Sequence, residues 1–468
     1  MTDQHATRVR WRILAILIFL MLATAFGRLN LAIAGKFLQE EFHFTNEVMG
    51  WILGAFAFGY ALFQIPSGWA GDRYGPRRTL TLAILWWSTL TILMTLVPLA
   101  VGKSSWWRLA WAFVAVRFLT GVGEAASYPN ANKIVANWMP AGQRGMGSSL
   151  LLGGVGAGGV LAPMVFAGTI QRWGWRSSFL LSGILAMLFV IIWHLYSTNR
   201  PGEHRSVNAA ELKILGASEG GHRAHSCHLS STSLRRVFAS SSVWALIASY
   251  FCHGYTPYIY YTWFFIYLTR VRGLTLTKGG LWGSTPFLAM TIMAPLGGWL
   301  SDKAVVRFGR RRGRQSTVWF GMTCSTLLLW IGSHTANNIS AILLLAVAAG
   351  FSHFAAPSWW ATCIDLTPEH AGLLSGLMNT CANLAGGIAP IATAYMATKF
   401  GWTTALDVAA LVTFCGGVMW MFVNAAAGLE VGSETQPATL ATSLSDRGAR
   451  PVAGANRSSQ IRHPGPKA

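Results

Sequence analysis

The sequence predicts an all-α membrane protein whose twelve transmembrane helices form two pseudo-symmetric six-helix bundles. Only 11% of the 468 residues are charged, whereas soluble globular proteins carry about 25%. Hydrophobic residues make up 53% of the chain, and the mean hydropathy is +0.42. Apolar runs of about 20 residues, the length that crosses a bilayer, recur along the chain. The twelve predicted spans are residues 12–34, 48–70, 79–99, 109–131, 146–168, 176–197, 242–268, 279–300, 316–334, 338–363, 372–397 and 403–425.

Positive charge gathers on one side of the predicted spans. The formal net charge is +20, which in a soluble protein would suggest a nucleic-acid partner. Here most of the 36 lysines and arginines fall in segments that face the cytoplasm if the N-terminus does. This bias follows the positive-inside rule and explains the charge without nucleic acid. We therefore expect a multi-pass protein of the plasma (inner) membrane, with the lipid bilayer around it and both termini cytoplasmic.

Short sequence matches indicate that the two bundles come from a duplicated six-span unit. The pentapeptides at 68–72 and 298–302 correspond, as do those at 172–176 and 399–403. The copies are about 230 residues apart, which is the pattern of a parallel repeat in secondary transporters. The predicted domains are an N-terminal six-helix bundle, a cytoplasmic connector, a C-terminal six-helix bundle and a disordered basic cytoplasmic tail, at 1–197, 198–241, 242–427 and 428–468.

The cysteine and histidine patterns do not predict a metal site or a disulfide framework. The six cysteines are scattered, and none forms a C-x-x-C pair. Three histidines and Cys227 crowd residues 222–228, which we interpret as a solvated part of the connector. The sequence has no histidine–carboxylate cluster and no soluble catalytic domain. We therefore expect no metal, no cofactor and no enzymatic activity.

One loop on the predicted cytoplasmic side carries a specific motif, G-W-A-G-D-R-Y-G-P-R-R at residues 68–78. Its first glycine permits two helices to approach closely, and its aspartate lies where a helix end meets a loop and can pair with a basic side chain. The motif resembles the signature loop of the major facilitator superfamily, and the resemblance implies the two-bundle fold of that superfamily. Its key residues are Gly68, Asp72, Arg73, Gly75, Arg77 and Arg78.

Four further stretches resemble one branch of that superfamily, the anion:cation symporter family of organic-anion and sugar-acid permeases. They are G-R-L-N-L-A-I-A at 27–34, Y-A-L-F-Q-I-P-S-G-W at 60–69, R-F-L-T-G-V-G-E-A-A-S-Y-P at 117–129 and G-W-R-S-S-F at 174–179. The resemblance implies a secondary active transporter that takes up an organic anion by proton-coupled symport and alternating access.

The resemblance also implies roles for residues inside the spans. Arg28 would hold the substrate carboxylate, for which a planar and always charged guanidinium is well suited. Glu124 would carry the proton, with Arg117 as its basic partner, and Tyr60 would line the substrate site. In the second half the substrate would contact an aromatic residue and an asparagine, for which the candidates are Trp359 or Trp360 and Asn379 or Asn383.

Arg28, Arg117 and Glu124 lie away from the ends of their spans and stand out without any resemblance, because a charge at the bilayer centre costs roughly 2.5–3.5 kcal/mol on insertion scales. Glu124 lies two helical turns from Arg117, so both share one helix face. The alternative reading is a static ion pair that orients helices. Gly27 departs from the family pattern, since many bacterial members have an aspartate directly before the first-span arginine. We therefore predict one proton per transport cycle.

The expected substrate is a small-molecule carboxylate, namely a sugar acid such as a hexuronate, aldonate or aldarate. The alternatives are another carboxylate, such as an aromatic acid or small dicarboxylate, an anion exchanger, or a transporter-like solute sensor. We expect a monomer. Some aromatic residues of the seventh span would contact a polyol, and others would form an interfacial belt. This cluster comprises Tyr255, Tyr258, Tyr260, Tyr261, Trp263 and Tyr267.

Overall fold

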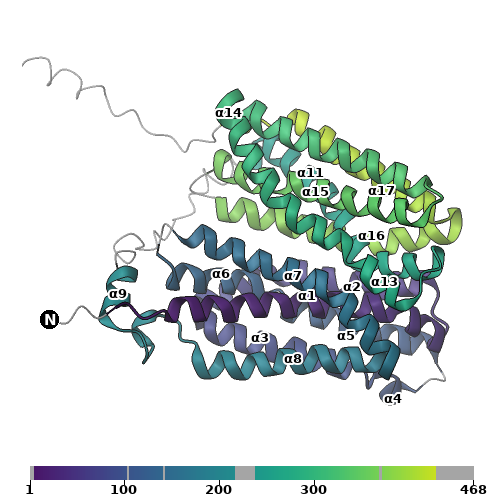
Figure 1. The fold of residues 1–468 in the computed structure, drawn as a ribbon, viewed down its shortest axis with the longest axis horizontal. Coiled ribbons are helices and arrows are strands. Elements are labelled where there is room, and N and C mark those ends of the chain that lie inside the picture. The colour runs from purple at the N-terminus through teal and green to yellow at the C-terminus, as the bar shows by residue number, and fades with distance from the viewer. Residues whose placement is uncertain (1–4, 103–104, 141–142, 217–237, 368–370, 428–468) are drawn as a thin grey trace, which may run out of the picture. The chain divides into compact units, whose positions relative to one another are not determined.

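The computed structural model describes residues 5–102, 105–140, 143–216, 238–367 and 371–427. Within these ranges the regular structure is entirely helical (Figure 1). The tail predicted at 428–468 and the histidine-rich stretch at 222–228 lie outside the described residues.

Helices of very different lengths make up both halves of the chain. Those of the first half and the connector are α1 (Val9–Phe42), α2 (Asn46–Tyr74), α3 (Pro76–Leu93), α4 (Val97–Val101), α5 (Trp106–Glu124), α6 (Ser127–Trp138), α7 (Arg144–Trp173), α8 (Trp175–Tyr196), η2 (Pro201–Glu203) and α9 (Ala209–Gly216). Those of the second half are α11 (Ser241–Thr262), α12 (Phe264–Ile266), η4 (Tyr267–Val271), α13 (Leu276–Gly283), α14 (Thr285–His334), α15 (Asn338–Leu366), α16 (Ala371–Phe400), α17 (Trp402–Met419) and η5 (Trp420–Phe422).

Each of the twelve predicted spans falls on one or more of these helices. In the described part of the chain, seven helical segments are long and apolar enough to cross a membrane. The other five spans fall on α3, α11, α16 and the two arms of α14. A break at Gly309 divides those arms, since its φ of 78° and ψ of 165° are not helical. The protein is therefore an all-α, multi-pass membrane protein.

Turns of a single glycine link several helix pairs. Gly75 joins α2 to α3, Gly174 joins α7 to α8, and Gly401 joins α16 to α17, with φ values of 86°, 76° and 90°. Only glycine adopts this region at little cost, so each helix ends abruptly and the chain reverses. Gly174 and Gly401 occupy matching places in the two copies of the repeat, which agrees with duplication.

The start of α1 is tied to the connector by Glu211 of α9. The backbone N–H groups of Val9 and Arg10 donate to its carboxylate at 3.2 and 3.1 Å, and the Thr7 hydroxyl donates to it at 2.5 Å. This fully buried carboxylate satisfies N–H groups that the first turn of a helix leaves unpaired. We call this end of the helices the connector end, and we call the opposite end, where α1 meets α2 at residues 43–45, the distal end.

The two halves contact each other mainly toward the distal end. There the Asn46 amide donates to the Thr398 hydroxyl at 3.4 Å, and the Ser284 hydroxyl donates to the Val160 carbonyl at 2.6 Å. Gly54 of α2 lies directly against the Gly387 carbonyl of α16. Among the described residues, the hydrogen bonds that join the two halves lie toward the distal end, and none joins their connector ends.

Candidate substrate and proton site

An arginine and a glutamate form an ion pair in the middle of the first half. Arg28 Nε of α1 lies 2.5 Å from Glu124 Oε1, at the end of α5. The Glu124 side chain is fully buried, whereas 22% of the Arg28 side chain is exposed. The second carboxylate oxygen of Glu124 has no hydrogen-bond partner among the described residues. Arg28 is therefore the more accessible member of the pair.

Arg117 lies near Glu124 and forms its hydrogen bonds with the backbone of α1. Its guanidinium donates from Nη1 to the Gly27 carbonyl at 3.2 Å and from Nη2 to the Arg28 carbonyl at 3.0 Å. It also lies over the Phe56 ring, 4.7 Å from the ring centroid. Arg117 thus holds the backbone of α1 next to α5, while its charge remains near Glu124.

Aromatic rings of α2 cover the charged groups. Phe56 and Tyr60 stack with centroids 6.1 Å apart. The Arg28 guanidinium lies 4.7 Å from the Tyr60 centroid and 5.6 Å from that of Phe56, at distances where a ring face attracts a cation. Gly121 permits this approach because a side chain there would collide with the Phe56 carbonyl. The structure therefore brings Arg28, Tyr60, Arg117 and Glu124 together.

The second half contributes two tyrosines and an asparagine. Tyr258 and Tyr261 of α11 lie within electrostatic reach of Arg28. The Tyr258 hydroxyl donates to Asn383 Oδ1 at 2.7 Å, and the Asn383 amide donates to the Asn379 carbonyl at 2.8 Å. Of the two candidate asparagines, Asn383 is thus the one whose side chain is linked to the groups around Arg28.

The two candidate tryptophans have different surroundings. Trp359 is fully buried, donates from Nε1 to the Ser249 hydroxyl at 3.2 Å, and packs edge-on against Trp420. Trp360 is 37% exposed and donates from Nε1 to the Tyr250 hydroxyl at 3.1 Å. Neither forms a hydrogen bond with the groups around Arg28 in the described structure.

The signature loop lies at the connector end, where it links α2 and α3. Lys133 of α6 pairs with Asp72 at 2.7 Å and donates to the Gly68 carbonyl. Arg77 donates to the His194 carbonyl of α8, and Gly75 makes the turn. Arg73 lies over the rings of two aromatic residues of its own helix, Trp69 and Tyr74. The motif therefore ties together the connector ends of α2, α3, α6 and α8, and no described contact distinguishes Arg78.

Several residues of this neighbourhood carry little sequence signal. Phe56 resembles any apolar residue of a span, and only its position under two guanidinium groups sets it apart. Tyr258 and Tyr261 belong to the aromatic cluster of the seventh span, whose other members pack elsewhere. Tyr260, for example, donates to the Leu345 carbonyl, and Trp263 donates to the Pro390 carbonyl. Helix phase, which sequence defines poorly, separates these roles.

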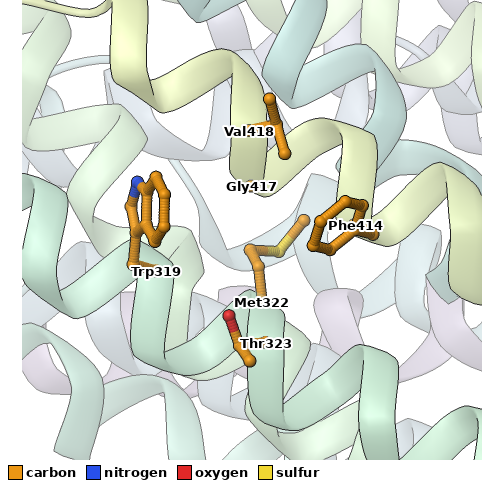
Figure 2. Close-up of a pocket in the computed structure, with 6 residues that line it drawn as sticks. All are labelled: Trp319, Met322, Thr323, Phe414, Gly417 and Val418. Atoms are coloured by element: carbon orange, nitrogen blue, oxygen red, sulfur yellow. The ribbon is translucent and has the colours of Figure 1, made fainter.

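A small pocket between α14 and α17 does not belong to this site. Figure 2 shows its lining, which consists mostly of apolar side chains. Trp319 and Phe414 at its edge are 41% and 49% exposed, which suits contact with lipid. The lining carries no charged group that could hold an anion. Its residues are Trp319, Met322, Thr323, Phe414, Gly417 and Val418.

Comparisons with known proteins identify the family. The model of the Major Facilitator Superfamily matches residues 14–390 and 280–461. A probable sulfoacetate transporter of Cupriavidus necator is 26% identical over 419 residues, which cover 89% of this chain and 94% of that protein. A probable galactarate/D-glucarate transporter of Bacillus subtilis is 28% identical over 434 residues, covering 90% and 91%.

A solved structure has the same fold. A bacterial homologue of the human lysosomal transporter Spinster, in an inward-facing and unoccupied conformation, superposes with a TM-score of 0.68 at 18% identity. The match covers 91% of this chain and 96% of that one. The conclusion rests on the all-helical fold, the match to the family model and the similarity to anion carriers. The chain belongs to the major facilitator superfamily, within its anion:cation symporter family, and is a transporter.

Proposed function

We propose that this transporter takes up a sugar acid together with protons, and that the ion pair of Arg28 and Glu124 couples the two. The observation that carries the proposal is the 2.5 Å contact between a partly exposed guanidinium and a fully buried carboxylate. A proton on Glu124 removes the negative charge that engages Arg28. The guanidinium then becomes free to bind a substrate carboxylate through its planar fork.

The coupling follows from competition for one cation. An ionised Glu124 and a substrate carboxylate both require Arg28, so anion binding favours protonation of Glu124, and protonation favours anion binding. When the anion leaves, Arg28 returns to Glu124 and the proton is released. The closed ion pair thus corresponds to the substrate-free state.

The contacts between the halves lie toward the distal end, which supports opening of the site toward the connector end. The signature loop and most of the positive charge belong to this end, which we assign to the cytoplasm by the positive-inside rule. The described conformation is then inward-facing, with the distal contacts closing the outer side. We assign the protein to the plasma membrane, as a monomer of two six-helix bundles with both termini cytoplasmic. Rocking of the halves would expose Arg28 to each side in turn.

Polyhydroxy acids suit the site better than aromatic acids. Opposite Arg28 the second half presents phenol hydroxyls and the Asn383 amide, which can exchange hydrogen bonds with substrate hydroxyls. A sugar acid would place its carboxylate on Arg28 and its hydroxyls toward α11 and α16. The galactarate/D-glucarate transporter among the relatives supports this class, and the sulfoacetate transporter indicates that a small organic anion is the alternative.

Uptake into proteoliposomes tests the proposal. We expect purified protein to accumulate D-glucarate, galactarate, D-gluconate or D-glucuronate when the lumen is alkaline, in preference to sulfoacetate and benzoate. Glu124→Gln should lose pH-driven accumulation and keep exchange of labelled for unlabelled substrate, because it mimics the protonated side chain. The matched control is Glu203→Gln, since Glu203 lies in the connector, where its carboxylate accepts from the backbone N–H groups of Asn199 and Arg200.

Three results would contradict the proposal. Normal pH-driven accumulation by Glu124→Gln would reduce the ion pair to a structural role. Uptake that requires an anion inside the vesicles, and ignores the pH gradient, would indicate an exchanger. Binding of D-glucarate without any accumulation would indicate a solute sensor.

A further inference from the structure

Two histidines form a pair in the second half, apart from the charged groups described above. His253 of α11 is buried and His353 of α15 is half-buried, with ring centroids 5.8 Å apart. Both lie near the middle of their helices, as do Arg28 and Glu124 in the spans of the first half. Histidine is the side chain whose ordinary titration lies nearest neutral pH, so such a pair is a candidate for proton binding.

The surroundings of His253 suit a cation. Its ring contacts both Tyr250 and Trp359, at centroid distances of 5.2 and 4.9 Å and interplanar angles of 28° and 27°, and these two rings also touch each other with centroids 5.5 Å apart. Aromatic faces attract a positive charge. Its Nδ1 lies 3.0 Å from the Ser352 hydroxyl, which can act as donor or acceptor and so serves either protonation state. Trp359 therefore flanks a histidine instead of contacting Arg28.

His353 lies on a face of α15 between those packed on α14 and on α11, where its ring still meets His253 of α11. Phe354 and Ala355 pack against glycines of α14, while Ser352 and Trp359 meet α11. His353 lies two turns before Trp360, so the two share a third face. Trp360 and Ile364, the next residue of this face toward the connector end, are 37% and 59% exposed.

This third face turns toward Arg28. Trp360 donates to the Tyr250 hydroxyl of α11, and Tyr261 lies three turns further along the same face of α11. Tyr261 in turn lies within electrostatic reach of Arg28. His353 is therefore on the side of the second half that faces the Arg28 site of the first half.

No carboxylate of the described chain contacts either histidine. The aspartate nearest along α15 is Asp365, more than three turns toward the connector end, where it pairs with Arg314 of α14. Arg28 is the charged group of α1 that faces α11, at its tyrosines. The middle parts of the helices packed around the pair also carry Tyr250, the tyrosines of the seventh span and five thiols, none of which is a carboxylate; the thiols are those of Cys252, Cys324, Cys363, Cys381 and Cys415.

An imidazolium here would thus be a buried charge without a counter-ion, which burial strongly disfavours. A substrate anion between the halves supplies that counter-ion. Because the two rings are only 5.8 Å apart, mutual repulsion limits the pair to one added proton. The Nδ1 atom of His353 lies beside the Ala349 carbonyl of α15 without a hydrogen bond of good geometry.

We propose that His353, backed by His253, is a second proton-binding site that takes up its proton together with the substrate anion. This inference rests on the function proposed above. One proton binds at Glu124 and the other at the histidine pair, so two protons accompany each anion instead of the one that Gly27 suggests. A substrate with two acid groups fits this arrangement, with one carboxylate on Arg28 and the other directed toward the imidazolium.

Proton stoichiometry in proteoliposomes tests the proposal, with D-glucarate as the first probe and galactarate and D-gluconate as the others. With the membrane potential clamped to zero and a gradient of one pH unit, we would find the opposing substrate gradient that stops net flux. Each proton contributes about 1.4 kcal/mol per pH unit, so two protons balance a gradient of about 100-fold and one balances about 10-fold. We expect about 100-fold for the wild type and about 10-fold for His353→Asn.

The matched control is His334→Asn, because His334 is an exposed histidine that pairs with Asp407 at the distal end. It should retain the wild-type gradient. If His353→Asn does not fold, His353→Gln and His253→Gln provide the same comparison, with exchange activity as the measure of folding. A value of about 10-fold in the wild type, unchanged in the variants, would overturn the second proton site and leave the proposed function intact. Absence of proton-driven uptake of all three acids would refute both.

Discussion

Replacing Gly54 by alanine should shift the transporter away from the conformation described here. Gly54 of α2 faces the Gly387 carbonyl of α16 at the distal contact, and a Cβ atom at position 54 would overlap that oxygen. Because backbone lies on the other side, no flexible side chain can move aside. Overpacking of this kind costs about 1–3 kcal/mol. Such a cost changes the ratio of two states by about 5- to 150-fold.

The shift can be measured as a distance between the two halves at the connector end. Ile65 of α2 and Leu373 of α16 are 61% and 40% exposed there and can carry spin labels. In the Gly54→Ala background we expect the population with the short label-to-label distance to grow, because opening the distal side closes the connector side. Pulsed electron–electron double resonance on the reconstituted protein measures the distribution of label-to-label distances and so gives the two populations.

Gly376→Ala is the matched control on the partner helix α16. A Cβ atom at Gly376 would meet no atom within 4 Å, so this variant has the same gain in helix propensity without the collision. Its distance distribution should equal that of the wild type. An unchanged distribution in Gly54→Ala as well would refute the idea that the contact of α2 with α16 holds the distal side closed.

Three further substitutions test individual contacts. Arg28→Lys keeps the charge but loses the planar fork, so KM for D-glucarate uptake should rise about 10- to 100-fold, since a hydrogen bond to a charged group contributes about 1.5–3 kcal/mol. Tyr258→Phe removes the hydroxyl that donates to Asn383, which should raise KM for D-glucarate about fivefold and leave uptake of the hydroxyl-free sulfoacetate unchanged. Arg314→Gln leaves Asp302 without its partner and Asp365 with Arg310 alone, so Tm in detergent should fall while the proton stoichiometry stays the same.

Sequence reasoning predicted the fold because membrane helices have a strong signal. Each apolar run of spanning length corresponds to a helix, and the repeat offset predicted two similar halves. The break between the arms of α14 depends on one glycine, Gly309, within an otherwise helical stretch. Its position could not be read from hydropathy, since residues 301–315 mix apolar and basic residues without a run that marks the break.

The charged residues could be found in the sequence because charges are rare and costly inside apolar spans, and the same rarity makes them functional candidates. Arg28 and Glu124 interrupt apolar runs, and the structure brings them into contact. The partner of Arg117 was less predictable. Its spacing from Glu124 predicted a shared helix face, but not that its guanidinium donates to backbone carbonyls of α1. Such contacts depend on how closely two helices approach each other, and the spacing of residues in the sequence does not reveal that distance.

Adjacent residues show where helix phase limits prediction. Trp359 and Trp360 are identical in type, yet one flanks His253 inside the bundle and the other is partly exposed beside Tyr250. Consecutive residues of a helix point about 100° apart, so an error of one position exchanges their environments. The histidine pair gave no signal for a related reason, because its members are 100 residues apart and each is unremarkable alone.

The glycine-lined distal contact bears on how fast the carrier can turn over. Where α2 meets α16, and where α13 meets α7, the touching surfaces are largely backbone whose hydrogen bonds are already made within each helix. Separating such surfaces breaks few hydrogen bonds, among them those of Asn46 with Thr398 and of Thr277 with Gln171, and releases few side chains that must be reordered afterwards. The contact between the halves can therefore open and close with little change in free energy. Fast turnover requires this, because a conformation that is too stable would slow every transport cycle.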